Sequence, residues 1–190
     1  HAIDKYGYDL ERDAENKPAA YKNDYVFKND IATECLPTIY DLYAFAYYPN
    51  KEDEMGCRIE RIIEYILDER FLYLPEKGYV YDQSNKRCYA SGNVYHACLR
   101  EDRKLLTLYL LSFFKASKNS DLFMSQIEQL NEYRYEDGFY AFDKALIKEK
   151  KNLYQLYTGG HMGLGENRRS KKYLKIESTF WMMAILKNLE

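Results

Sequence analysis

The sequence predicts an all-α fold, an α/α toroid or partial α/α barrel of stacked helical hairpins, with short β-hairpin insertions between outer and inner helices. Three observations favour this class. Helical segments alternate between apolar on all sides and apolar on one side. A helix followed by an aromatic run occurs twice, with Gly78 and Gly138 60 residues apart. The resulting order of inner and outer helices is typical of hairpins stacked around a centre.

The first two helices form one inner and outer pair. Residues 34–47 are apolar on nearly every side, with Thr33 as the predicted N-cap and Pro37 in the first turn, so we expect a helix buried all round. Residues 53–70 carry one apolar stripe opposite charged residues, which predicts an outer helix. Residues 77–92 alternate aromatic and polar about a turn, which predicts a β-hairpin.

The same order then repeats. Residues 102–116 predict a second inner helix and residues 120–133 a second outer helix. Residues 138–160 predict a longer counterpart of the hairpin, and residues 170–188 a third inner helix. Because both connectors join an outer helix to an inner one, we expect them at the same end of the scaffold, where binding sites are usually built.

The chain divides into a short leading segment and one large domain. Residues 1–30 are predicted to be extended or irregular. Residues 31–190 are predicted to form the toroid-like domain, with two internal repeats at about 34–100 and 101–170 before the final inner helix.

Composition limits the function classes. The chain has 190 residues, a net charge of −2 and a pI near 6.0, which argues against a general nucleic-acid binder with a broad basic face. No run reaches the roughly 18 apolar residues needed to span a bilayer, so no membrane insertion is expected. The four cysteines show no Cys-x-x-Cys spacing, which favours reduced thiols and a cytoplasmic setting.

Two segments near the C-terminus carry a resemblance to a known group. Residues Gly160–Arg169 and Glu177–Trp181 resemble uncharacterised bacterial toroid-like proteins of the superfamily that includes terpenoid cyclases and protein prenyltransferase β subunits. The resemblance implies the fold and by itself no activity. The Asp-x-Asp-Asp cluster of the cyclases and the Asp, Cys and His zinc ligands of the prenyltransferases have no clear equivalent here. His96 and His161 could form a zinc site with Cys88, Cys98 or Glu166, but without any His-x-x-x-His or Cys-x-x-Cys spacing neither a metal nor another cofactor is predicted.

The segment before the last helix is the first candidate site. Residues 159–169 hold four of the nine glycines and end in Arg168 and Arg169. Glycine-rich backbone at a helix N-terminus exposes N–H groups that can bind an anion. In that case at least one of Gly160, Gly163 and Gly165 should adopt a positive φ angle or pack against another backbone. The alternative is a purely structural turn.

Three titratable residues are candidates for acid/base chemistry. Glu177 falls on an apolar helical face, where a carboxylate is costly unless it is paired or used. The alternative for Glu177 is a structural salt bridge with Arg168 or Arg169. His161 and His96 lie in the two connectors and could transfer protons, although hydrogen-bonded loop histidines are the default.

Two functions follow as hypotheses. The first is binding of a small or elongated organic ligand, prenyl-like or carbohydrate-like, at a tyrosine-lined mouth, with hydrolase, lyase or transferase chemistry if the protein is an enzyme. The alternative is a non-catalytic protein-interaction module that uses the same end. The oligomeric state is not predicted. The residues expected to line the mouth are Tyr81, Tyr89, Arg100, Tyr157, Gly160, Glu166, Asn167, Arg168, Arg169 and Trp181.

Overall fold

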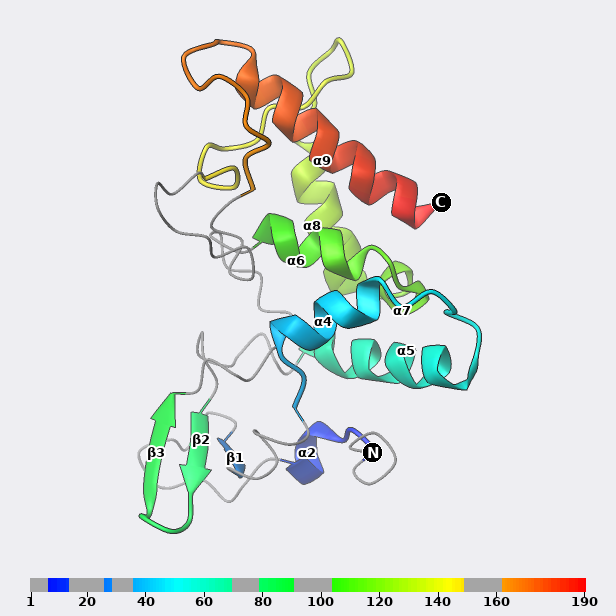
Figure 1. Cartoon of the computed structure of the whole chain (residues 1–190), viewed down its shortest axis with the longest axis vertical. Helices are drawn as coiled ribbons and strands as arrows, with labels where there is room; N and C mark the ends of the chain where they lie inside the picture. Colours follow the sequence, from blue (N-terminus) through cyan, green and yellow to red (C-terminus); the bar gives the residue numbers. More distant parts are fainter. Residues whose placement is uncertain (1–6, 14–25, 29–35, 70–78, 91–103, 149–161) are drawn as a thin grey trace. The chain divides into compact units, whose positions relative to one another are not determined.

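The chain consists of two compact units, residues 1–98 and 99–190. A computed structural model describes residues 7–13, 26–28, 36–69, 79–90, 104–148 and 162–190 (Figure 1). Each unit has its own buried apolar side chains.

The helices among the described residues of the first unit are α2 (Leu10–Asp13), α4 (Ile39–Ala46) and α5 (Glu54–Ile66). Helix α5 is amphipathic, because isoleucines recur on one side and charged residues occupy the other. The stripe is fully buried and forms much of this unit's core. Its members are Ile59, Ile62, Ile63 and Ile66.

A tight corner joins α4 to α5. The Lys51 ammonium group donates to the carbonyls of Phe45 and Ala46, where the C-terminus of α4 favours a cation. Burial lowers the pKa of Lys51 below its ordinary value. Asp53 caps α5 by accepting a hydrogen bond from the Gly56 amide at 2.7 Å. Both helix ends at this corner therefore have polar side chains that satisfy their backbone groups.

A three-stranded sheet completes the first unit. Strand β2 (Tyr79–Asp82) lies between β1 (Val26–Lys28), which is parallel to it, and β3 (Arg87–Ala90), which is antiparallel to it. Phe27 of β1 pairs with Val80 of β2, and both side chains are buried. The sheet thus contributes apolar side chains to the core as well as backbone pairing.

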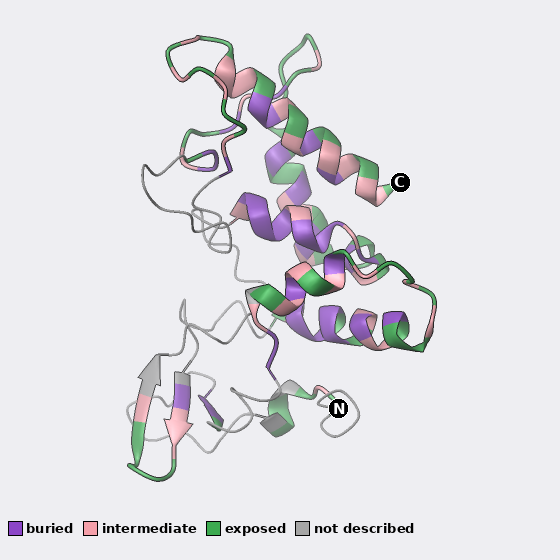
Figure 2. Cartoon of the chain, in the orientation of Figure 1, coloured by how far each residue is buried: buried purple, intermediate pink, exposed green. Residues whose placement is uncertain are grey.

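The second unit contains α6 (Lys104–Leu111), α7 (Lys115–Lys118), α8 (Asp121–Asn131) and α9 (Tyr173–Leu189). Helix α6 is the most buried of them, and α8 buries one side only. Figure 2 shows that α9 carries both buried and exposed residues along its length. Helix α9 packs against α6, and Asn188 donates to the Ser112 hydroxyl at 2.9 Å.

The prediction of an all-α toroid is wrong. The described residues form helices and a mixed three-stranded sheet, and they divide between two units. Strand β1 was missed because three residues give no readable alternation, and because its parallel partner lies beyond α4 and α5 in the chain. The predicted hairpin at 77–92 is confirmed as β2 and β3. Its predicted counterpart shows only an isolated bridge between Arg134 and Tyr140 within the residues described up to 148.

The predicted distinction between inner and outer helices holds only in part. The burial predicted for the helix at 102–116 is confirmed, although this helix is shorter than predicted and ends at Leu111. The one-sided burial predicted for the two outer helices is confirmed in α5 and α8. Helix α4 is not buried all round, since Tyr40 and Tyr47 are 63% and 61% exposed. It also begins later than predicted, because Thr38 and Asp41 form a capping box after Pro37. Thr33 lies outside the described residues.

Replacing Gly56 should destabilise the first unit. A Cβ atom there would overlap the Lys51 carbonyl and lie 2.8 Å from the Asn50 oxygen, and backbone cannot move as a side-chain end can. We expect Gly56→Ala to lower the free energy of unfolding by about 2–3 kcal/mol, measured by urea denaturation. The neighbouring exposed thiol provides the control, since Cys57→Ala should change stability by less than about 0.5 kcal/mol. Equal stability of the two variants would contradict the close approach.

Candidate functional site

Three consecutive polar residues of α9 hold two other segments of the second unit. Glu177 and Ser178 have no exposed surface, and Thr179 is half-buried. The Ser178 hydroxyl accepts the Phe142 amide and the Thr179 hydroxyl accepts the Tyr140 amide, both at 2.9 Å. The aromatic run after α8 is therefore bonded to α9 through hydroxyl groups, while its Ala141 amide donates to the Tyr133 carbonyl at 3.1 Å on the other edge.

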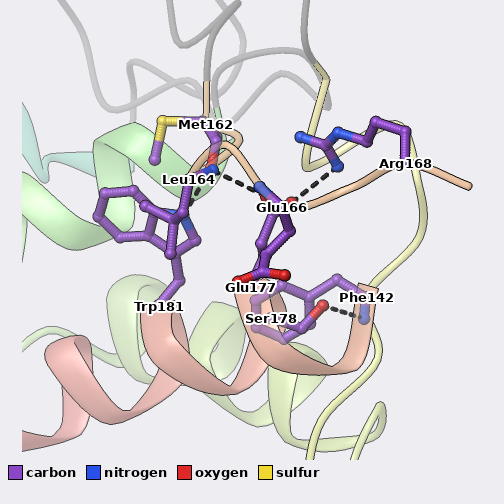
Figure 3. Close-up of polar contacts among 8 residues, drawn as sticks. All are labelled: Phe142, Met162, Leu164, Glu166, Arg168, Glu177, Ser178 and Trp181. Carbon is purple, nitrogen blue, oxygen red and sulfur yellow. Dashed lines mark hydrogen bonds and ion pairs between the residues drawn. The ribbon is translucent and has the colours of Figure 1, made fainter. Parts of the chain in front are cut away.

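Glu177 holds the segment that precedes α9. Its Oε1 accepts hydrogen bonds from the amides of Leu164 and Glu166, at 2.8 and 3.2 Å (Figure 3). Its Oε2 lies 2.7 Å from a guanidinium nitrogen of Arg168, whose side chain is 29% exposed. The Arg168 guanidinium also stacks 4.7 Å from the centre of the Tyr173 ring. A buried carboxylate is stable in this setting because amides and a cation replace its water.

The glycine-rich loop has the conformation that anion binding required. Gly165 adopts a φ angle of +86°, which a residue with a side chain rarely adopts. The loop amides that were expected to bind an external anion donate to Glu177 instead. Nearby, the Trp181 indole donates to the Met162 carbonyl at 2.7 Å (Figure 3). The anion at this loop is thus part of the chain itself.

This geometry favours the structural alternative for Glu177. Because the side chain has no exposed surface, a substrate could reach it only by displacing the loop. The expected pair with Arg168 is present, as a single 2.7 Å contact. Arg169 is exposed, and its amide donates to the Asn167 side chain at 3.0 Å. The hypothesis of acid/base chemistry at Glu177 gains no support from these contacts.

The predicted mouth is only partly described. Tyr81 and Tyr89 belong to β2 and β3 of the first unit, whereas the other described residues of the mouth belong to the second unit, namely Glu166, Asn167, Arg168, Arg169 and Trp181. The predicted site residues outside the described ranges are His96, Arg100, Tyr157, Gly160 and His161.

The opposite side of α9 carries an exposed apolar stripe. Ile176, Phe180 and Met183 are 47%, 53% and 56% exposed, and their spacing of four and three residues places them on one face. Lys172 and Lys187 are exposed at the two ends of the same face. We call these five residues the outer face of α9. Burial all round was predicted for this helix, and that prediction is wrong for this face.

A turn beside α9 binds one of its lysines. Lys175 forms an ion pair with Asp137, and its ammonium group lies 4.9 Å from the centre of the Phe139 ring and 5.5 Å from that of Tyr135. The hydrogen bond from Lys175 lowers the pKa of Asp137 below its ordinary value near 3.8. This contact fixes the 135–139 turn against the N-terminal half of α9.

A shallow depression lies elsewhere in the second unit. Its volume of about 290 Å³ is at the lower end for small-ligand pockets. Lys104 in its wall donates to Gln129 at 2.7 Å. None of the residues predicted for the mouth lines it. The lining residues are Lys104, Gln129, Leu130, Glu132, Tyr133, Asp143, Ala145 and Leu146.

Sequence reasoning missed the two hydroxyls and the outer face. Serine and threonine within a helix often bond to their own helix backbone, so their presence at 178 and 179 gave no specific signal. The outer face had a signal, since apolar residues all round α9 predict cover on both sides. That pattern does not reveal whether the cover comes from the same chain or from a partner.

No protein family, curated protein or solved structure matches the chain in comparisons with known proteins. The resemblance to bacterial toroid-like proteins is therefore not tested by any relative. Among the described helices, none has both the length and the apolar character needed to cross a membrane. The described residues also contain no group of three or more His, Cys, Asp or Glu side chains placed to hold a metal ion.

Removing the Glu177 carboxylate should destabilise the second unit. Glu177→Ala leaves two loop amides and the Arg168 guanidinium without their buried acceptor, so we expect a loss of about 3 kcal/mol or more. Thermal unfolding measures this as a fall in Tm on the order of 10 °C. Glu177→Gln keeps one oxygen acceptor and should lose less. The control is Glu128→Ala on the exposed side of α8, which should stay within about 0.5 kcal/mol. Unchanged stability in Glu177→Ala would refute the structural role.

Removing the Lys175 ammonium group should raise the pKa of Asp137. In Lys175→Met the carboxylate loses its principal charged donor, so its pKa should return toward the ordinary value near 3.8. Carboxyl NMR titration measures the change, and Lys172→Met is the control. A depressed folded pKa stabilises the fold above the unfolded pKa, and this contribution is lost as pH falls through the folded pKa. The stability difference between wild type and Lys175→Met should therefore shrink below about pH 4. A constant difference would contradict the ion pair's role.

Proposed function

We propose that the second unit is a non-catalytic protein-interaction module that docks a partner on the outer face of α9. The observation that carries this proposal is the exposure of Ile176, Phe180 and Met183 on one stripe of a 17-residue helix. Large apolar side chains gathered on one face mark interaction sites more often than scattered ones do. Because each of them is already about half buried, covering the rest would contribute about 0.7–1.5 kcal/mol per side chain before the costs of association.

The inner side of the same helix supports this function. Glu177, Ser178 and Thr179 bind two chain segments, and Trp181 contacts the Tyr109 ring at 5.1 Å between centroids. These contacts fix the rotation of α9 about its axis. The apolar stripe is therefore presented in a constant orientation, which lowers the entropy lost on binding.

The enzyme hypothesis has less support. It requires a carboxylate that a substrate can reach, and Glu177 is buried beneath the loop. The depression near Lys104 is small and lies among other residues than those expected for the mouth. We therefore rank ligand binding with acid/base chemistry second.

A cytoplasmic setting is part of the proposal. Cys57 and Cys88 are free thiols, and Cys57 is exposed. Exposed free thiols persist most readily in reducing compartments.

Crosslinking in cells tests the interaction. A photoreactive benzoylphenylalanine at position 183 should capture a partner protein, whereas the same group at Met124, exposed on α8, should not. The captured protein, once purified, should bind the wild-type chain, and Phe180→Asp should weaken Kd by at least about 30-fold because a central apolar anchor becomes a desolvated charge. Circular dichroism should show an unchanged fold. Equal crosslinking at both positions, or an unchanged Kd, would reject this function.

A further inference from the structure

The outer face of α9 has a definite order of chemistry along its length. Lys172, Ile176, Phe180, Met183 and Lys187 fall within about 80° of one another around the helix axis at ~100° per residue. The apolar centre extends about 10 Å and the two lysines stand about 22 Å apart, at 1.5 Å per residue. The outer face therefore has a positive charge at each end and an apolar centre between them, all along one line.

This shape suits a helix as partner. A helix has no unpaired backbone edge, so an added β-strand has no hydrogen-bonding groups to pair with. A narrow stripe with anchors spaced by three and four residues matches the apolar face of a second helix, which packs at 8–10 Å between axes.

The charge at the N-terminal end of α9 is opposite to what the helix dipole favours. Residues 162–190 hold six Lys or Arg and three Glu, in a chain whose net charge is −2. Glu177 is buried against Arg168, so it does not offset the exposed basic residues. Helix N-termini favour acidic side chains, yet α9 has none in its first turn and begins after the exposed residues Lys171 and Lys172. A partner that brings carboxylates to this end would satisfy the lysines and the helix dipole together.

A second copy of the chain fits this face poorly. If two outer faces pack antiparallel, Lys172 of one copy lies opposite Lys187 of the other. If they pack parallel, each lysine lies opposite its own equivalent. Like charges therefore meet at both ends in either arrangement, which is unfavourable.

A lipid surface also fits poorly. Helices that lie on membranes carry their basic residues on the polar side and keep a long apolar side for the lipid. Here the lysines lie on the apolar line itself and limit it to the three central side chains.

We infer that the partner segment is an acidic amphipathic helix, with apolar anchors in its middle and carboxylates near both ends, spaced to reach Lys172 and Lys187. This inference rests on the proposed function and specifies the class of partner. The partner helix needs about 15 residues to span the two lysines.

Two synthetic peptides test the inference on the full-length chain. The first is an 18-residue helical peptide with Glu at both ends, Leu at three central positions spaced by four and three, and Ala and Gln elsewhere. The second has Lys in place of every Glu. Fluorescence anisotropy should show that the acidic peptide binds at least tenfold more tightly than the basic one. Phe180→Asp should abolish binding of the acidic peptide.

A charge reversal provides the decisive comparison. Lys172→Glu combined with Lys187→Glu should invert the preference, so that the basic peptide binds more tightly. The control combines Lys118→Glu with Lys144→Glu, two exposed lysines away from the outer face, and should keep the wild-type preference at the same net charge. If the variant with Lys172→Glu and Lys187→Glu still bound the acidic peptide more tightly, the roles assigned to Lys172 and Lys187 would be wrong.

The other outcomes separate this inference from the proposed function. If both peptides bind equally and Phe180→Asp abolishes both, the face docks helices but the acidic partner class is wrong. Concentration-dependent dimers in sedimentation, lost in Phe180→Asp, would replace the acidic helix by a second copy. Binding to phosphatidylserine vesicles but to neither peptide would assign the face to lipid. Binding to no probe, together with no specific crosslink at position 183, would reject the proposed function as well.

Discussion

The second unit depends on a buried carboxylate, Glu177, whose charge must be compensated inside the fold. Two backbone amides of the glycine loop and the Arg168 guanidinium supply that compensation. Ser178 and Thr179 extend the same arrangement to the aromatic run after α8. Helix α9 thus uses three of its polar side chains internally, while Met182 and Ile185 are buried and Ile176, Phe180 and Met183 are exposed. An exposed apolar stripe on a helix that is anchored in this way is typical of an interaction surface.

Local patterns predicted local structure well. The isoleucine stripe of α5 and the alternating pattern of β2 and β3 each act within one element, so their burial and pairing follow from the sequence. The failures concern partners that are distant in the chain. Strand β1 pairs with β2 across α4 and α5 in the chain, and a three-residue segment carries no pattern that specifies such pairing. The toroid prediction assumed that the repeated units pack alike, whereas the aromatic run near Tyr140 bonds to α9.

In the candidate site, too, the sequence predicted the character of individual residues better than it predicted the groups that they contact. The position of Glu177 on an apolar face predicted burial, and Arg168 was foreseen as its counter-ion among the alternatives. The left-handed glycine was also expected and is found at Gly165. The sequence could not reveal that the anion of the glycine loop would be a side chain 11 to 13 residues further along. Nor could apolarity all round α9 reveal which side lacks cover, because the hydrophobic effect depends on area and not on the identity of the covering chain.

The chain contains a single tryptophan, and its location makes it an intrinsic optical reporter. The Trp181 indole bonds to Met162 in the anchored loop, and its ring contacts both Tyr109 of α6 and Phe180 of the outer face. Its emission therefore responds to loop release, to separation of α6 from α9 and to contact at Phe180. One native fluorophore can follow the integrity of the second unit and the occupancy of its surface without a label.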